Sequence, residues 1–185
     1  MSRVIAVASQ KGGVGKTTTA VNLGFALSRF GNRILMIDGD PQGGMAIASN
    51  LNRRTHLGLI HLLRNEHTPK EVIATTKDGR IAAIGMGEME PEDLRMLEDE
   101  AQIGNLGTIV RDMADGYDYA IIDAPAGMGG LVSALLGIST SVLIPLNCRA
   151  ISVKSLPPFL KLIHWLKDSV NPALILDGIV LTMVD

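Results

Sequence analysis

Short apolar runs alternate with longer segments of helical periodicity along this chain. Runs of mostly aliphatic residues predict buried strands at 3–9, 33–38, 79–85, 117–123 and 141–146, with a last one within 174–184. Apolar residues recur at helical spacing in 16–30, 91–114 and 150–170. Near-continuous apolar strands that alternate with helices predict an α/β fold, in which helices flank a mostly parallel sheet.

Glycine and proline refine the boundaries of these elements. Gly31 fits the C-terminal stop of helix 16–30, whereas Pro157 and Pro158 predict a kink or a late start in 150–170. Residues 50–90 have little periodicity and are expected to form short helices and loops on the surface. Because no repeat, linker or low-complexity tract interrupts the pattern, residues 1–185 are expected to form a single domain.

Composition narrows the class of protein. No apolar run approaches the roughly 20 residues of a membrane span, and the start of the chain lacks a signal-peptide pattern. We therefore expect a cytoplasmic protein. Cys148 is the only cysteine, which excludes an internal disulfide and a metal cluster held by several cysteines of one chain. His56, His61, His67 and His164 lack metal-ligand spacing and are expected on the surface or in helix packing.

The overall charge does not favour binding to nucleic acid. The formal net charge is -2, so only a local basic patch could attract nucleic acid. Aromatic residues make up 3% of the chain, which leaves few platforms for stacking single-stranded bases.

A glycine-rich stretch, "ASQKGGVGKTTTA" at 8–20, joins the first predicted strand to the first predicted helix. Its glycines permit positive φ angles and let backbone N–H groups face an anion, and the helix N-terminus adds partial positive charge. Lys16 can reach the β- and γ-phosphates of a nucleotide, and the Thr17 hydroxyl can bind Mg²⁺. Thr18 fits a contact with the α-phosphate.

The same stretch departs from the standard phosphate-binding loop, G-x-x-x-x-G-K-[ST]. Gly15, Lys16 and Thr17 supply the end of that pattern. Gln10 stands where its first glycine belongs, and a second lysine, Lys11, follows at once.

Carboxylates follow two of the predicted strands. Asp38 and Asp40 end the second strand, and Asp123 ends the strand at 117–123. Ligands of parallel sheets bind beyond the carboxyl ends of the strands. Three carboxylates there can hold Mg²⁺, mostly through water, and orient an attacking water. Taken alone, Asp38 could also be a helix cap or a turn former.

Three motifs in this order and spacing resemble the ParA/MinD family of deviant Walker A ATPases: "KGGVGKTTTAVNL", "ILMIDGDPQGG" and "YDYAIIDAP". Asp-Pro-Gln at 40–42 and "LTMVD" at 181–185 resemble its ParA/Soj partition branch, whereas "DAPAG" at 123–127 resembles the MinD pattern. The resemblance implies a P-loop NTPase fold, ATP and Mg²⁺ as ligands, and slow, partner-stimulated ATP hydrolysis.

The resemblance also implies a role for each residue of the site. In an ATP-bound homodimer, Lys11 would be the signature lysine that reaches the partner's phosphates, and Gly12 must be small to let it pass. Lys11, Lys16 and Asp40 would be catalytic, and Thr17, Asp38 and Asp123 would serve the metal. The nucleotide-binding residues would be Lys11, Gly12, Gly13, Val14, Gly15, Lys16, Thr17 and Thr18.

The implied biological role is the partition of plasmid or chromosomal DNA, or the positioning of a cargo over the nucleoid. An adaptor protein would stimulate hydrolysis, and a full-length form would bind DNA non-specifically. The alternative is a MinD-like, membrane-associated ATPase that regulates division or flagellar placement. Cluster assembly on the same fold is disfavoured by the single cysteine, Cys148.

Two features depart from the family pattern. Family members continue beyond the position of Asp185, so we expect a fragment whose last strand exposes a sheet edge. Arg149 stands where the partition branch often has an acidic residue.

Overall fold

The computed structural model describes residues 2–45 and 56–184. The described helices are α1 (Lys16–Arg29), α3 (Leu59–Leu63), α4 (Pro69–Val72), α5 (Pro91–Gln102), α6 (Asn105–Ala114), α7 (Gly130–Gly137) and α8 (Ala150–Ser169). The strands are β1 (Arg3–Ser9), β2 (Ile34–Asp38), β3 (Ala74–Thr75), β4 (Ile81–Ile84), β5 (Tyr119–Ala126), β6 (Ser141–Asn147) and β7 (Ile175–Thr182).

The strands form one seven-stranded sheet in the order β3-β4-β2-β5-β1-β6-β7. Every neighbouring pair is parallel except β3 and β4. The mostly parallel α/β sheet expected from the sequence is therefore confirmed. Because β1, β2, β5 and β6 run in the same direction, their carboxyl ends meet at one edge of the sheet.

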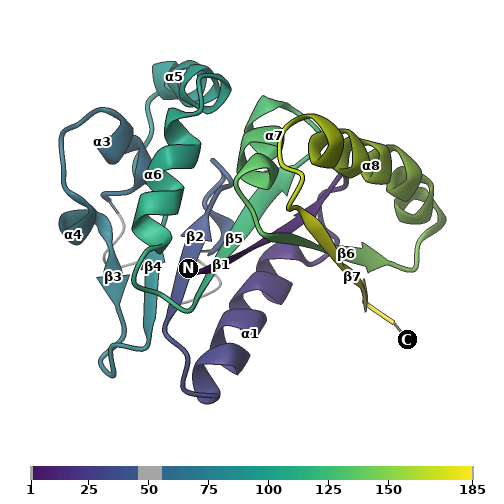
Figure 1. Cartoon of the computed structure of the whole chain (residues 1–185), viewed down its shortest axis with the longest axis horizontal. Helices are drawn as coiled ribbons and strands as arrows, with labels where there is room; N and C mark the ends of the chain where they lie inside the picture. The colour runs from purple at the N-terminus through teal and green to yellow at the C-terminus, as the bar shows by residue number, and fades with distance from the viewer. Residues whose placement is uncertain (1, 46–55, 185) are drawn as a thin grey trace.

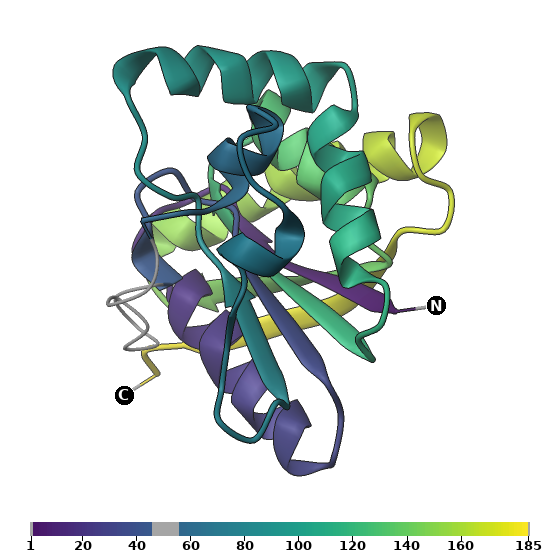
Figure 2. The ribbon, with the colours of Figure 1, turned by 90° about the vertical axis from the view of Figure 1, so that its left-hand side faces the viewer.

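Helices cover both faces of this sheet, with α1 on one face and α5 to α8 on the other (Figures 1 and 2). Alternate residues of the buried strands serve the two faces. Leu35 and Ile37 of β2 belong to the larger apolar cluster, together with residues of α5 to α8. Ile34 and Met36 belong to the smaller cluster beneath α1.

Several predicted elements differ from the observed ones. The helix predicted for 91–114 is two helices, because Gly104 takes a left-handed conformation (φ 84) and begins α6 in a new direction. Of the two alternatives predicted for 150–170, a kink or a late start, the late start is wrong, since α8 begins at Ala150 and contains both prolines. The predictions missed α7 and the two-residue β3. Of 50–90, α3 and α4 are short helices as expected, and 50–55 lie outside the described residues. The surface position expected for this region is wrong for α3, because Leu59 and Ile60 are 0% exposed and belong to the larger apolar cluster.

Strand β7 is the outer strand expected from the sequence. It pairs with β6 and with no other strand of the described chain. This edge of the sheet presents apolar side chains. The exposed ones on β7 are Ile175, Leu176, Ile179 and Leu181.

Strands β2 and β5 approach closely just beyond Asp38, because Gly39 has no side chain. The Gly39 N–H donates to the carbonyl of Asp123 at 2.9 Å. A Cβ at Gly39 would stand 2.8 Å from Leu135 Cδ1 and 3.0 Å from that same carbonyl oxygen. The glycine thus keeps Asp38, at the end of β2, beside Asp123. The expectation that Asp123 ends its strand is wrong, because β5 continues to Ala126.

We predict that Gly39→Ala lowers the free energy of unfolding by about 1–3 kcal/mol, because the added methyl group overpacks this contact. The matched control is Gly130→Ala, where no atom lies within 4 Å of the added Cβ; its effect should stay within about 0.5 kcal/mol. Urea denaturation measures both. Parental stability in Gly39→Ala would contradict the close approach of β2 and β5.

Candidate functional site

The glycine-rich loop connects β1 to α1 and leaves the start of α1 open. Gly15 is the N-cap residue and adopts φ 88, and Gly13 adopts φ 70, values that only glycine takes without strain. No side chain caps α1, and its first turn contains no acidic residue. The backbone N–H groups at this helix end therefore remain available to an anion, which the helix dipole also favours.

The two lysines of the loop occupy different environments. Lys16, the first residue of α1, is 8% exposed. Lys11 is half-buried beside the exposed Gly12 and Gly13, and the Ser9 hydroxyl donates to its carbonyl at 2.9 Å. Neither lysine forms an ion pair within 4.0 Å in the described part of the chain. Lys16 is thus held inside the loop, and Lys11 lies on its rim.

The rim around Lys11 is open. No atom lies within 4 Å of a Cβ built on Gly13, and the nearest to one on Gly12 is Ala126 Cβ at 4.0 Å. Gln10, which replaces the glycine of the standard loop, has a buried Oε1 with no hydrogen-bond partner among the described residues. Nothing in the structure explains this atom.

Two buried carboxylates lie side by side next to the loop. Asp38 and Asp123 are register partners on β2 and β5, whose backbones lie about 4.8 Å apart. Both residues are 1% exposed. Burial is the largest influence on each and raises the pKa of each carboxyl to about 6.

The two aspartates differ in their hydrogen bonds. Asp38 accepts backbone N–H groups from Asp40 at 3.1 Å and from Met45 at 2.9 Å. It therefore organises the loop after β2, as its reading as a turn former predicted. Neither oxygen of Asp123 accepts a hydrogen bond from the described residues, although the Thr17 hydroxyl and the Lys16 charge lie close enough to lower its pKa.

Asp40 lies at the start of the loop that Asp38 organises. Its Oδ1 accepts the Gln42 N–H at 3.0 Å, and its carbonyl accepts the Gly43 N–H at 2.9 Å. Because Asp40 is half-buried, its carboxylate keeps contact with solvent.

These residues fit Mg²⁺ held largely through water. The two buried oxygens of Asp123 lack donors, and a cation can satisfy them. The Thr17 hydroxyl lies nearby, with Gly44 packed against it: a Cβ at Gly44 would stand 3.2 Å from Thr17 Oγ1. Among 2–45 and 56–184, no three His, Cys, Asp or Glu side chains form a metal cage. Mg²⁺ suits this arrangement, because it usually retains several waters.

Sequence reasoning missed the residues that shape this site without polar side chains. Gly44 and Met45 shape the loop after β2 through close packing and a backbone N–H. The glycine pair in "DPQGG" was the available signal for Gly44. No signal pointed to Met45, since its contribution is a backbone group. Arg149 is the exposed N-cap residue of α8.

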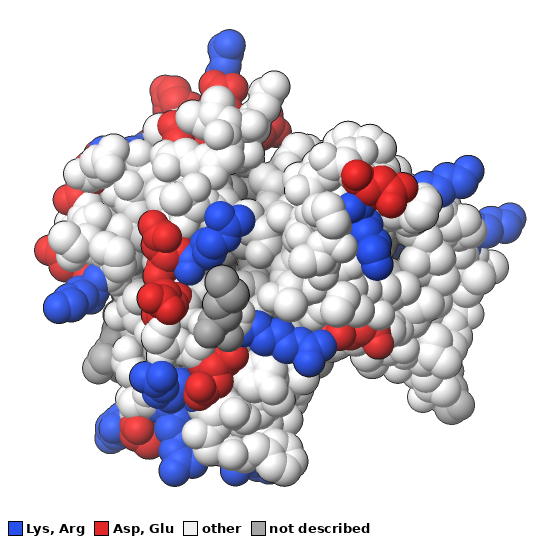
Figure 3. Space-filling view, viewed as in Figure 1, with Lys and Arg blue, Asp and Glu red and all other residues white. Residues whose placement is uncertain are grey.

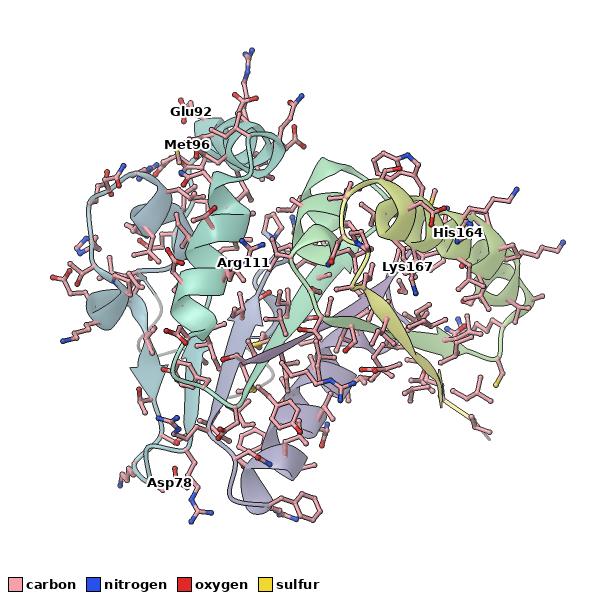
Figure 4. The ribbon with its side chains drawn as sticks, viewed as in Figure 1. Asp78, Glu92, Met96, Arg111, His164 and Lys167 are labelled. Carbon is pink, nitrogen blue, oxygen red and sulfur yellow. The ribbon has the colours of Figure 1, made fainter. Side chains whose placement is uncertain are left out.

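Three of the four histidines lie close to a carboxylate. His56, His67 and His164 lie 2.5, 3.8 and 3.3 Å from Glu88, Glu71 and Asp168, respectively. His164 and Lys167 lie on α8, far from the aspartate pair along the chain (Figure 4).

Charge is mixed over the surface in view. Basic and acidic side chains are interspersed on the face in Figure 3, without one gathered basic patch there. In the ranges 2–45 and 56–184, no helix is long and apolar enough to cross a membrane.

Comparisons with known proteins agree on one family. A family model described as an AAA domain matches residues 2–176. The chain is 33% identical over 187 residues to the chromosome partitioning protein ParA of Myxococcus xanthus, with 100% of this chain and 66% of ParA covered. It is 34% identical over 185 residues to the chromosome-partitioning ATPase Soj of Thermus thermophilus, covering 99% of this chain and 70% of Soj. The chain thus spans about two thirds of these relatives' lengths.

A solved structure shares the fold. Cobyrinic acid a,c-diamide synthase from Mycobacterium smegmatis, with a bound ATP analogue and magnesium, superposes with a TM-score of 0.86 at 30% sequence identity. The match covers 100% of this chain and 76% of the synthase.

The pKa of Asp123 makes stability depend on pH. The pKa of Asp123 is about 6 in the folded protein and roughly 3.9 in the unfolded chain. Protonation of Asp123 therefore stabilises the folded protein at low pH, and this stabilisation is lost as the pH rises through 6. Without metal at pH 7.5, we predict that Asp123→Asn raises the free energy of unfolding by about 1–3 kcal/mol, and that this gain shrinks at pH 5.

Urea denaturation in EDTA at both pH values measures this gain, with the exposed Asp99→Asn as the matched control. We expect little change in that control at either pH. If Asp123→Asn is less stable than the parent at pH 7.5, the prediction is wrong. Neighbouring groups would then stabilise the negative charge of Asp123 in the folded protein.

Proposed function

Because the chain belongs to the ParA/MinD family of deviant Walker A ATPases, we propose that it is an ATP-dependent, dimerising switch ATPase of the ParA type. One observation carries this proposal. The phosphate loop holds one lysine buried at the start of α1, Lys16, and a second, Lys11, half-buried on an open glycine rim.

ATP binds, in this proposal, with its phosphates at the loop residues 11–18 and the N-terminus of α1. The uncapped N–H groups donate to phosphate oxygens, and Lys16 balances their charge from within the subunit. Thr17, Asp38 and Asp123 would hold Mg²⁺, the two aspartates mostly through its water shell. Mg²⁺, when bound, supplies charge neutralisation for the phosphate oxygens.

Asp40 orients the attacking water in the proposed hydrolysis. Asp38 and Asp123 are buried side by side on the neighbouring strands β2 and β5, whereas Asp40 remains in contact with solvent. Its backbone is fixed by the turn through Gln42 and by its N–H bond to Asp38. A carboxylate that is both fixed and solvated can accept a hydrogen bond from water.

Two ATP-bound subunits would then pack with their phosphate loops facing. Gly12 and Gly13 are exposed and leave room for another chain. Lys11 reaches the partner's phosphates across this interface, so ATP favours the dimer and hydrolysis releases it.

The use that we propose for this switch is the partition of plasmid or chromosomal DNA, or the positioning of a cargo over the nucleoid. The names of two relatives, both of which refer to chromosome partitioning, support the first of these. An adaptor protein would stimulate slow hydrolysis, and the ATP dimer would bind DNA non-specifically. The "DAPAG" sequence at 123–127 is the feature that favours the MinD-like alternative. Sedimentation of the ATP-bound protein with plasmid DNA, or with vesicles rich in phosphatidylglycerol, separates these two functions.

We predict that Lys11→Ala keeps ATP binding but loses ATP-driven dimerisation. Removing one member of a desolvated charge pair typically costs about 2–5 kcal/mol, and a two-fold interface contains two such pairs. Sedimentation with and without Mg–ATP measures dimerisation, and calorimetry measures binding.

Two variants serve as controls for Lys11→Ala. Lys70→Ala removes an exposed lysine of α4 and should dimerise like the parent. Lys16→Ala should lose ATP binding itself. If Lys11→Ala dimerises in ATP as well as the parent does, Lys11 does not act across the interface, and the proposed switch mechanism is contradicted.

We predict that Asp40→Asn retains ATP binding and lowers phosphate release by about 100-fold, because it removes the carboxylate that orients water. The asparagine oxygen can still accept the Gln42 N–H, so the turn is kept. Phosphate release at saturating ATP is the measurement. If Asp40→Asn releases phosphate at the parental rate, Asp40 does not orient the attacking water. Asp38 would then be the next candidate.

A further inference from the structure

We propose that Thr182, on edge strand β7, is a positioning residue for the phosphate loop. The inference rests on the proposed nucleotide binding. The Thr182 hydroxyl donates to the Val14 carbonyl at 2.8 Å, across 168 residues of sequence. Its methyl carbon, Cγ2, lies 3.5 Å from where a Cβ on Gly15 would stand. The side chain of Thr182 therefore bonds to one residue of the peptide unit that precedes α1 and packs beside the other.

This contact fixes the direction of a backbone donor. In a trans peptide, the C=O and the N–H of one unit point in opposite directions. The Val14–Gly15 peptide is trans, as are all peptide bonds in the described chain. While Thr182 holds the Val14 carbonyl on its own side, the Gly15 N–H points to the opposite side.

The Gly15 N–H is also free. Among the described residues it has no hydrogen-bond acceptor, whereas the Gly15 carbonyl accepts the Thr19 N–H at 2.9 Å as the first bond of α1. Since Gly15 is a glycine at φ 88, its peptide planes could rotate more readily than those of other residues. The hydroxyl of Thr182 removes that freedom and holds the donor ready for a phosphate oxygen.

A bulge in β7 determines that Thr182 faces the loop. The pairing of β6 with β7 shifts by one residue, from Val142 with Leu176 to Leu143 with Gly178. Beyond the shift, Asn147 pairs with Thr182. Without the extra residue, Leu181 would occupy this position, because a one-residue slip moves side chains to the other face of a sheet.

The test compares three single variants with the parent by calorimetry with Mg–ADP. Thr182→Val keeps the shape of the side chain and removes the hydroxyl, and Thr182→Ser keeps the hydroxyl. Thr140→Val is the matched control: Thr140 Oγ1 accepts the Val4 N–H at 3.0 Å, at the other end of the sheet. We expect Thr182→Val to weaken Mg–ADP binding about threefold to tenfold, as loss of one hydrogen bond does. Thr182→Ser and Thr140→Val should stay within about twofold.

Hydrogen–deuterium exchange of the nucleotide-free proteins provides an independent measurement. Amides of residues 10–16 should exchange faster in Thr182→Val than in the parent, and at the parental rate in Thr182→Ser and Thr140→Val. Unchanged loop exchange in Thr182→Val would overturn the inference. An equal loss of Mg–ADP affinity in Thr182→Val and Thr182→Ser would also overturn the inference. The packing of the Thr182 methyl group, rather than its hydroxyl, would then explain the loss. Failure of the parent to bind Mg–ADP would instead refute the proposed function, while the exchange result would still decide the role of Thr182.

Discussion

The parallel register of β1, β2 and β5 is the constraint on which the site depends. It brings the glycine loop after β1, Asp38 at the end of β2 and Asp123 on β5 to one edge of the sheet. Ligands bind at such edges because the strand ends leave a crevice into which helix N-termini point. Gly39 makes this register possible at the site itself, since a larger residue there would push β2 away from β5.

The same register leaves the site electrostatically incomplete. Two carboxylates lie buried in neighbouring strands, and neither oxygen of Asp123 accepts a hydrogen bond within 3.5 Å from the described residues, although the Thr17 hydroxyl lies nearby. On the other side of the loop, the first turn of α1 presents uncapped N–H groups beside Lys16. A nucleotide phosphate with Mg²⁺ complements both parts of the site. The negative phosphate fits the N–H groups of α1 and Lys16, and the positive metal ion fits the buried carboxylates. Function and stability therefore oppose each other at Asp123, as is common at functional sites.

Much of this arrangement could be predicted from local sequence. Strand β1, helix α1 and the loop between them combine strong apolar periodicity with a phosphate-loop pattern, and all were predicted within a residue. The break between α5 and α6 was not predicted, because it depends on the backbone conformation of Gly104 in an otherwise helical segment. Helix α7 was missed because "GLVSALLG" is apolar on every side and shows no period.

The remaining features of the site depend on contacts between distant parts of the chain. Thr182 reaches Val14 only because a bulge in β7 shifts its register. Each residue lies in a motif of the sequence, but nothing in either motif predicts this contact. Asp38 could be assigned to the site from its position after a strand, but its bonds to Asp40 and Met45 depend on the path of the following loop.

The central claim is that nucleotide phosphate and Mg²⁺ together complete this site. The most direct measurement is the free energy of unfolding at pH 7.5 with Mg–ATP, ATP in EDTA, Mg²⁺ alone and Mg–AMP. A ligand at 100 times its Kd stabilises the folded protein by about 2.7 kcal/mol. The account predicts stabilisation of that order with Mg–ATP and little with Mg²⁺ alone or Mg–AMP. Equal stability in all four conditions, at millimolar ATP, would contradict it.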